Sequence, residues 1–432
     1  MSINISEKIK TCFFLLRCTL KKDTWQLINP CDVLLVRHDN NCGYKYCGKV
    51  YAQLIDSFGE LCNRRNLKVS SVATFGSKFI GNLAYYSPVS YDKSFVTIAI
   101  IGKVVKILRG RDFGIKWGES HYKNLWCEIL EKAAPKIVIG IQPDKHLIQA
   151  GKLKKIPVYD LQHGIITDED PYYGEVYRRD NPITNLPDGF LCWDEQSIVT
   201  ILKWAKNKGI PIIKVGNPWF LRFVTIHPDD LLVNKAIARE KIIGDDRPCI
   251  MVTLQWGLAK YYVEREFNGV MVEVLEKVIL DTIDTYHWIL RLHPIQMIGS
   301  ERKRVLNYLK TTFGDENVRR WLIESEIPLP LVLSVADLHI TDHSAVVVEA
   351  AWMGIRSGLL GKELGSGKKY ESWFSHERSI GMAEVLPQNP DIIKQWIVTT
   401  LAKGPAKPTL KDSSQVLDTF IDNIVTRCNH DR

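Results

Sequence analysis

The stretch of sequence that decides the fold runs from Ala336 to Gly354 and reads ADLHITDHSAVVVEAAWMG. A short apolar run is followed by polar residues and then by a helix-length apolar segment. Thr341, Asp342 and Ser344 crowd the expected helix start, where hydroxyls and free backbone N–H groups hold a phosphate or simply cap the helix. The pattern predicts a strand, a polar turn and a helix, which is the repeating unit of a parallel sheet.

Similar units recur along most of the chain. In the amino-terminal half, strands are expected at residues 32–37, 68–73, 95–101, 136–141, 157–161, 189–193 and 211–215, with helices at 50–64, 120–133 and 196–206. In the other half, strands are expected at 249–254, 287–292, 338–341 and 357–360, with helices at 264–280, 301–312, 344–353, 390–401 and 414–427. This alternation predicts an α/β protein with two Rossmann-like domains.

The domain boundaries follow from breaks in the pattern. An amino-terminal domain is expected over residues 1–220, an irregular linker over 221–247, a second domain over 248–388, and helices over 389–432 that can cross back to the first domain. The two parallel sheets are expected to face a central cleft, because ligands of open α/β sheets lie beyond the carboxyl ends of the strands.

The composition is that of a globular protein. The chain has 432 residues, of which 45% are hydrophobic and 25% charged, which excludes disordered, collagen-like and coiled-coil proteins. The net charge of +8 favours anionic partners, but no Lys/Arg stripe indicates nucleic acid. No apolar run approaches the ~20 residues that span a bilayer, and no secretory signal is evident. Cytoplasmic residence is expected.

Residues 3–22 combine apolar side chains with five cations. This composition is typical of a basic amphipathic helix at the inner face of the cytoplasmic membrane, and equally of a first helix packed on its own domain.

The ten cysteines are scattered without a CxxC pair or zinc spacing, so no metal site is predicted.

Polar side chains follow three expected strands of the second domain. Thr253, Gln255 and Gly257 follow one strand, Arg291, His293 and Pro294 end the next, and Thr341, Asp342, His343 and Ser344 end the third. Arg291 and His293 can stabilise a phosphate, although His293 equally suits a structural hydrogen bond. Glu349 lies in an apolar helix, where it can bind ribose hydroxyls or face solvent. Together these residues predict a nucleotide-donor site.

The His293-Pro294 pair, the Thr341–Ser344 motif and the following helix with Glu349 resemble the donor-binding half of bacterial GT-B glycosyltransferases. The similarity is to sialyltransferases, Kdo transferases and teichoic-acid polymerases, and it covers roughly residues 249–360. It implies a GT-B-like fold, a cytidine-nucleotide donor, and phosphate contacts from His293 and Ser344. This sequence has Ser344-Ala345 where those families commonly have two serines.

The first domain offers three candidate catalytic residues. Gln162, His163 and Gly164 are similar to a QHG element in some surface-polysaccharide transferases. His163 is a candidate general base on an acceptor hydroxyl, or it orients the acceptor or bonds within a turn. Asp168 lies in an acidic run expected to be exposed. Glu119 is a candidate base or nucleophile, although compensation of helix charge at a helix start explains it too.

These features favour a metal-independent glycosyltransferase that moves a sugar from a nucleotide donor to a hydroxyl of a growing surface glycan, such as lipopolysaccharide or capsule. A CMP-linked acidic sugar such as Kdo or sialic acid is the preferred donor and a UDP-sugar the next. The nucleotide-sugar is a substrate, so no cofactor is expected, and the acceptor is a glycan or lipid-linked glycan. The alternatives are a CDP-polyol phosphotransferase of teichoic-acid type and a noncatalytic protein that binds anionic ligands.

Overall fold

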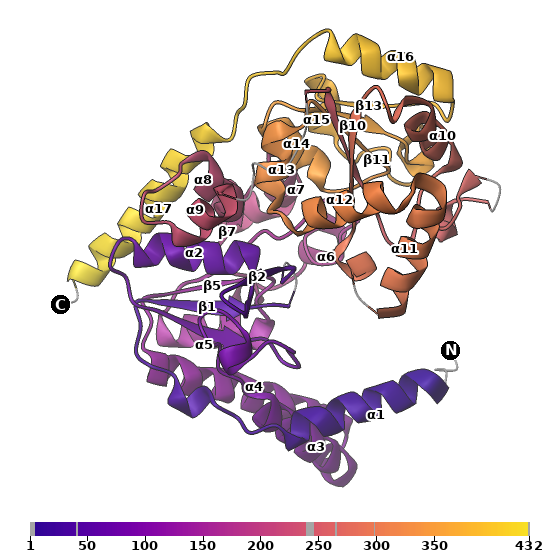
Figure 1. The fold of residues 1–432 in the computed structure, drawn as a ribbon. Helices are drawn as coiled ribbons and strands as arrows, with labels where there is room; N and C mark the ends of the chain where they lie inside the picture. The colour runs from indigo at the N-terminus through magenta and orange to yellow at the C-terminus, as the bar shows by residue number, and fades with distance from the viewer. Residues whose placement is uncertain (1–4, 40–41, 239–245, 264–265, 298, 431–432) are drawn as a thin grey trace. The chain divides into compact units, whose positions relative to one another are not determined.

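The computed structural model describes residues 5–39, 42–238, 246–263, 266–297 and 299–430, which form two compact units (Figure 1). Unit 1 comprises the described residues within 1–193, 197–219 and 415–432, and unit 2 those within 194–196 and 220–414.

Unit 1 is built on a six-stranded parallel sheet in the order β4-β1-β5-β6-β7-β8. Its strands are β1 (Val33–Arg37), β4 (Val69–Ala73), β5 (Ile137–Gly140), β6 (Val158–Leu161), β7 (Gly189–Cys192) and β8 (Ile212–Lys214). An antiparallel pair, β2 (Tyr44–Tyr46) and β3 (Lys49–Tyr51), follows β1. The helices of this part of the chain are α1 (Ile5–Leu20), α2 (Gln53–Asn63), α3 (Asp92–Arg109), α4 (Arg111–Ala133), α5 (Lys145–Lys154), α6 (Glu175–Arg178), α7 (Glu195–Ala205) and α17 (Lys411–His430).

Unit 2 contains a five-stranded parallel sheet in the order β10-β9-β11-β12-β13. The strands are β9 (Cys249–Thr253), β10 (His287–Arg291), β11 (Leu338–Thr341), β12 (Arg356–Leu359) and β13 (Ala383–Val385). The main helices are α8 (Pro218–Val224), α9 (Leu231–Ile237), α10 (Glu273–Thr282), α11 (Gly299–Phe313), α12 (Asp315–Glu326), α13 (Leu329–Val335), α14 (Val346–Trp352), α15 (Ser375–Ser379) and α16 (Pro390–Leu401). The predicted α/β class with two Rossmann-like parallel sheets is confirmed.

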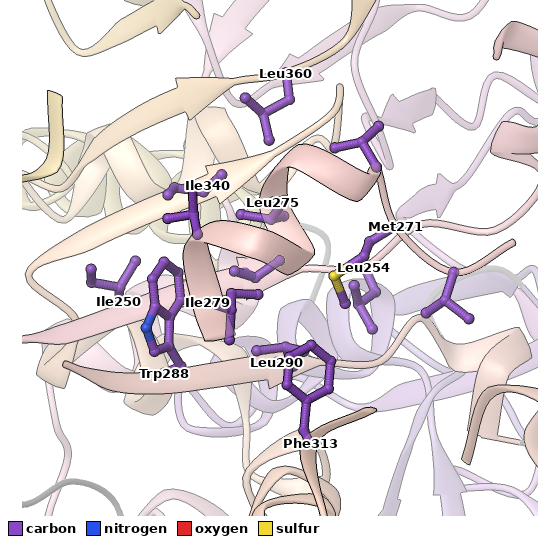
Figure 2. Packing of buried hydrophobic residues seen from close by; sticks show 14 of the residues in the cluster. Ile250, Leu254, Met271, Leu275, Ile279, Trp288, Leu290, Phe313, Ile340 and Leu360 are labelled. Carbon is purple, nitrogen blue, oxygen red and sulfur yellow. The ribbon is translucent and has the colours of Figure 1, made fainter. Parts of the chain in front are cut away.

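The core of unit 2 explains why its strands read as continuous apolar runs. Ile250, Leu290 and Ile340 come from three neighbouring strands and are completely buried, and helix residues such as Ile279 pack against them (Figure 2). A strand covered by helices on both faces needs apolar side chains on both, which removes the alternation of a half-exposed strand. Trp288 is also fully buried, and its indole N–H donates to Thr282 Oγ1 at 3.2 Å.

The predicted strand at residues 95–101 is wrong, because this segment lies within α3. The Asp23 carboxylate accepts the backbone N–H groups of Lys93 and Ser94 at 2.8 Å each and thereby caps the helix. A short β-branched run does not distinguish a strand from a helix by periodicity. The cap comes from 70 residues away and leaves no local signal.

The segment 221–247, expected to be an irregular linker, contains most of α8 and all of α9. Arg222 and Asp230 form a buried ion pair at 2.7 Å, and Asp230 also caps α9 by accepting the N–H of Val233. The buried residues of both helices are otherwise mostly apolar, as Phe220, Leu221 and Val233 show, and the ion pair joins the two helices.

The two carboxyl-terminal helices belong to different units. Ile393 and Trp396 place α16 in the core of unit 2. By contrast, Phe420 of α17 contacts the ring of Phe58 in unit 1, and Arg65 donates to Asp422 at 2.7 Å.

Candidate functional site

Three strand-end loops of unit 2 are joined by the side chains of Gln255 and Gln296. Gln255 Oε1 accepts the backbone N–H of His343 at 2.8 Å, which ties the loop after β9 to the loop after β11. Gln296 Nε2 donates to the Gln255 carbonyl at 3.3 Å, and Gln296 Oε1 accepts the backbone N–H of His293 at 2.8 Å. Since β10, β9 and β11 are adjacent and parallel, these bonds fix a single polar edge of the sheet.

His293 is held in a defined tautomer. Its Nδ1 accepts the backbone N–H of Ile295 at 3.2 Å, so the neutral ring carries its proton on Nε2. Burial lowers the pKa of His293 below its usual value, which favours that neutral form. The side chain therefore presents one N–H donor. Pro294 is exposed and is the first residue of the short helix Pro294–Met297, which follows His293.

His343 lies within a cluster of aromatic rings. Its ring centroid is 5.5 Å from that of Tyr261, 5.9 Å from that of Tyr370 and 5.8 Å from that of Trp373. Burial, with a smaller effect from Lys260, lowers the pKa of His343 to about 4. A neutral imidazole among three aromatic rings offers flat surfaces for stacking.

The Ser344 hydroxyl bonds to the start of α14 from the position just before its N-cap residue, Ala345. Its hydroxyl oxygen accepts the N–H of Val346 at 3.3 Å, at the first residue of α14. The hydroxyl proton remains able to donate, because a hydroxyl both donates and accepts. Ser344 is therefore compatible with capping and with a ligand contact.

Thr341 and Asp342 are occupied by contacts within unit 2. Thr341 Oγ1 donates to the Thr253 carbonyl at 3.0 Å, and the residue is 1% exposed. The Tyr262 hydroxyl donates to Asp342, whose pKa burial raises to about 6. These two side chains hold the loop in place.

Thr253 belongs to a buried polar row across three strands. Its Oγ1 lies 2.8 Å from His339 Nε2, and His339 Nδ1 lies 2.9 Å from Ser357 Oγ. Burial lowers the pKa of His339 to about 3, so this imidazole is neutral. Gly257 has a φ of +79° with open space where a Cβ would be, so it serves the turn rather than a close packing contact.

Part of the Arg291 guanidinium is used in hydrogen bonds within unit 2. Its Nη1 donates to the carbonyls of Glu324 and Ile327, at 3.1 and 2.9 Å, at the end of α12. Burial lowers the pKa of Arg291 to about 10, an effect that the charge of Glu349 opposes. The guanidinium stays charged near neutral pH.

Glu349 carries a carboxyl group with no hydrogen bond or ion pair to any residue that the structure describes. Burial raises its pKa to about 8, and the positive charge of Arg291 partly counteracts this. An unpaired, partly buried carboxyl is costly to keep unless it serves a purpose. Its burial argues against the alternative that Glu349 simply faces solvent on the surface of the helix.

In unit 1, Gln162 shapes the loop after β6. Its Nε2 donates to the Gly164 carbonyl and Ser197 Oγ at 2.8 Å each, and its Oε1 accepts the N–H of Trp193 at 2.7 Å. Between these anchors lies His163, whose Nδ1 is buried without a hydrogen-bond partner in the described part of the chain. Burial, with a smaller contribution from His38, lowers the pKa of His163 to about 4. His38 follows β1, and no motif in the sequence marks it as a site residue.

The sequence predicts Glu119 just before a helix, where its charge would compensate the helix dipole. This prediction is wrong, because Glu119 lies inside α4. Its carboxylate instead lies 2.7 Å from Lys145 Nζ and 3.0 Å from His146 Nε2, at the start of α5. Burial acts to raise the pKa of Glu119, but these partners outweigh it and lower the pKa. The residue joins two helices.

Asp168 pairs with Lys203 of α7. The loop that follows is anchored, because Tyr172 donates its hydroxyl to the Pro143 carbonyl at 2.8 Å and Tyr173 is 2% exposed. Both tyrosine side chains are therefore engaged in contacts within unit 1. Asp160, which no sequence motif marks, accepts the Gln142 N–H at 2.9 Å, and burial raises its pKa to about 7.

No three His, Cys, Asp or Glu side chains among the described residues are placed to share a metal ion. None of the helices that the structure describes is long and apolar enough to cross a membrane.

No protein family matches the chain, and no curated protein matches it in sequence. Solved structures share its fold, and the predicted GT-B-like class is confirmed. The chain is similar to UDP-GlcNAc 2-epimerase from Neisseria meningitidis bound to UDP-GlcNAc, with 12% identity and a TM-score of 0.51 over 91% of this chain and 99% of that chain. It is also similar to the Methanocaldococcus jannaschii UDP-GlcNAc 2-epimerase in complex with UDP-GlcNAc and UDP, with 13% identity and a TM-score of 0.50 over 91% and 99%. The wall teichoic acid polymerase TagF reaches a TM-score of 0.49 with 12% identity over 99% and 100%, which is too low to support an inference. At these identities the similarity establishes the fold alone.

Proposed function

We propose that the chain is a glycosyltransferase that moves a sugar from a nucleotide donor to a hydroxyl of a bacterial surface glycan, with the nucleotide bound at the strand-end loops of unit 2. The observation that carries the proposal is the link of His343 to Gln255 and of Gln255 to Gln296. It fixes three loops at one edge of a parallel sheet, the edge at which such sheets bind ligands.

The groups at this edge suit a departing nucleotide. Transfer breaks the bond between the anomeric carbon and a phosphate oxygen, and negative charge develops on that oxygen. The Nε2–H of His293 and the hydroxyl of Ser344 donate to it, while the positive charge of Arg291 adds long-range stabilisation. The carboxyl group of Glu349, which a pKa of about 8 keeps largely protonated near pH 7, hydrogen-bonds to the ribose hydroxyls.

His163 is the proposed acceptor-side residue. A pKa of about 4 keeps its imidazole neutral near pH 7, so a ring nitrogen can accept a hydrogen bond from the acceptor hydroxyl. Such a weak base orients the hydroxyl and takes its proton late, as the bond to the sugar forms. The contacts of Glu119 and Asp168 support structural roles for both residues. The nucleotide-sugar is a substrate, and the proposal includes no metal or other cofactor.

The donor is proposed in two forms. A CMP-linked acidic sugar follows from the resemblance of His293-Pro294 and Thr341–Ser344 to the cytidine-dependent transferases. A UDP-sugar gains support from the two epimerase structures, which are described with UDP-GlcNAc bound. Those structures also favour a second candidate function, epimerisation of a UDP-sugar. A polyol-phosphate transfer would use the same phosphate contacts, and a noncatalytic anion-binding protein would bind the nucleotide without turning it over.

The test is to incubate the protein with CMP-Kdo, CMP-sialic acid, UDP-GlcNAc or CDP-glycerol, with and without an extract of lipid-linked glycans. A glycosyltransferase releases nucleotide and labels the glycan only when acceptor is present, and EDTA leaves the rate unchanged. An epimerase alters the sugar of UDP-GlcNAc without acceptor. Conversion of UDP-GlcNAc alone, or transfer of glycerol phosphate alone, would overturn the glycosyltransferase proposal in favour of that activity.

A further inference from the structure

The tip of the α3–α4 hairpin carries an exposed apolar surface. Gly110, with a φ of +89°, joins the two helices, and Ile107 and Leu108 just before it are 83% and 76% exposed. Other exposed apolar side chains extend this surface along both helices: Ile100, Ile101, Val104, Phe113 and Ile115. We call this surface, over residues 100–116, the hairpin tip.

The hairpin tip is a packed structure. At Gly114 an added Cβ would lie 2.6 Å from the Cα of Lys106, so the two helix backbones are in close contact there. Gly102 faces the ring of Trp117 at 3.7 Å in the same way. The exposed side chains are therefore presented by a rigid helix pair, and their exposure is not that of a frayed end.

Exposed cations are interspersed with these apolar residues along the sequence. Lys103, Lys106, Arg109, Arg111 and Lys116 are all exposed, and Asp112 is the one acidic residue within 100–116, which gives the segment a net charge of +4. The Arg109 guanidinium lies 5.3 Å from the centroid of the Phe113 ring. Apolar side chains bordered by Lys and Arg are the composition of a surface that binds anionic lipid.

The neighbouring helix α1 lies beside α3 (Figure 1). Phe14 of α1 packs on Phe75 and Arg17 donates to the Gly76 carbonyl, so its described part is attached to unit 1. Phe13 and Leu20 on the same helix are 68% and 78% exposed. The packing alternative for segment 3–22 is therefore supported over its described residues, and the membrane alternative stays a prediction; residues 3 and 4 lie outside the described residues.

We propose that the hairpin tip is a membrane-docking element that inserts its apolar side chains into the interface of a bilayer rich in anionic lipid. Self-association through this surface would bring two sets of five cations together, which charge repulsion opposes. A phosphate-rich lipid surface instead satisfies both the cations and the apolar side chains.

The test is co-sedimentation of the full chain with phosphatidylcholine vesicles, with or without phosphatidylglycerol. The wild type should bind the anionic vesicles, and the Ile107→Asp/Leu108→Asp variant should bind them at least about tenfold more weakly. An Arg109→Gln/Arg111→Gln variant should lose a similar factor, and high salt should weaken wild-type binding. Val398→Asp, on an exposed helix position of unit 2 that is 58% exposed, is the matched control and should bind as the wild type does.

Circular dichroism and nucleotide titration verify that each variant is folded, and both readouts are independent of lipid binding. Equal vesicle binding by wild type and the Ile107→Asp/Leu108→Asp variant would overturn the proposal. So would a failure of the folded wild type to bind anionic vesicles. A wild-type dimer in sedimentation velocity that this variant converts to monomer, without vesicle binding, would identify the surface as a contact between two copies.

Discussion

The backbone N–H of His343 donates to Gln255 Oε1 across 2.8 Å, which fastens the loop after β11 to the loop after β9. Gln255→Leu removes the acceptor and leaves that N–H unpaired, at a cost of about 1–3 kcal/mol where the group is buried. We expect nucleotide affinity to fall about tenfold or more, measured by calorimetry. Gln149→Leu breaks a comparable bond to Asn185 in unit 1 and is the matched control. Equal losses of affinity in both variants would contradict a specific role for Gln255.

His293 allows a pair of substitutions that separate its two nitrogens. Gln places an amide donor near the position of Nε2, whereas Asn keeps only a partner near Nδ1 for the Ile295 N–H. We expect His293→Ala and His293→Asn to lower turnover by about 10²- to 10³-fold, and His293→Gln to recover part of the loss. Steady-state rates at saturating donor measure this. A His293→Asn variant more active than His293→Gln would place the important contact at Nδ1 and make His293 a loop-positioning residue.

Glu349 predicts a pH dependence of stability. Its pKa is about 8 in the folded protein and about 4.3 when unfolded. Between these values the folded state holds a proton that the unfolded state has released, so the free energy of unfolding falls as pH rises. The Glu349→Gln side chain does not titrate, so the variant should not lose this part of the free energy of unfolding as pH rises. The variant should melt about 2–4 °C above the wild type at about pH 9 and close to it at about pH 4. A difference in Tm that does not change with pH would contradict the raised pKa.

Glu119 and His163 are expected to behave differently in transfer assays. Glu119→Gln weakens the contacts to Lys145 and His146, and exposed pairs contribute about 0.2–1 kcal/mol. We therefore expect a small loss of thermal stability and full transfer activity. His163→Ala should lower transfer far more than it lowers nucleotide affinity, since the lost contact belongs to the acceptor. Loss of activity in Glu119→Gln with full activity in His163→Ala would reverse the two roles.

The parallel sheets were predictable because their strands are apolar on both faces. The apolar run 287–292 predicts a strand, and β10 occupies His287–Arg291. What could not be predicted depends on contacts between distant segments. Asp23 caps α3 from 70 residues away. The ion pair between Arg222 and Asp230, which are eight residues apart in sequence, joins two short helices, and only the folded chain shows that the two side chains meet. Both features are polar and carry no periodic signal.

The sequence predicts which residues lie at the strand ends of the candidate site, but it does not predict which of their side chains contact one another. Strand ends identified Gln255, His293 and His343, which the structure connects. The same rule also selected Thr253 and Thr341, whose hydroxyls are bound within the sheet. A strand-terminal residue points toward the ligand edge or into the sheet according to its neighbours, and a single sequence does not give this direction.

Four further residues of the site come from short 3-10 helices and turns. Tyr261, Tyr370 and Trp373 surround His343, and Gln296 connects two loops. Their segments have no periodicity to indicate where the side chains meet, so only the folded chain brings these residues to His343 or to the loop network.

The most direct test of the account is calorimetric titration of the chain with CMP, CDP, UDP and GDP, repeated with the His293→Ala/Ser344→Ala variant. The account predicts that at least one of these nucleotides binds the wild type, with CMP or CDP favoured and UDP next. It predicts that the variant, with an unchanged melting temperature, binds that nucleotide at least about tenfold more weakly, since each lost charge-assisted hydrogen bond contributes about 1.5–3 kcal/mol. Failure of all four nucleotides to bind the folded wild type, or equal affinity in the variant, would contradict a donor site at the ends of β9, β10 and β11.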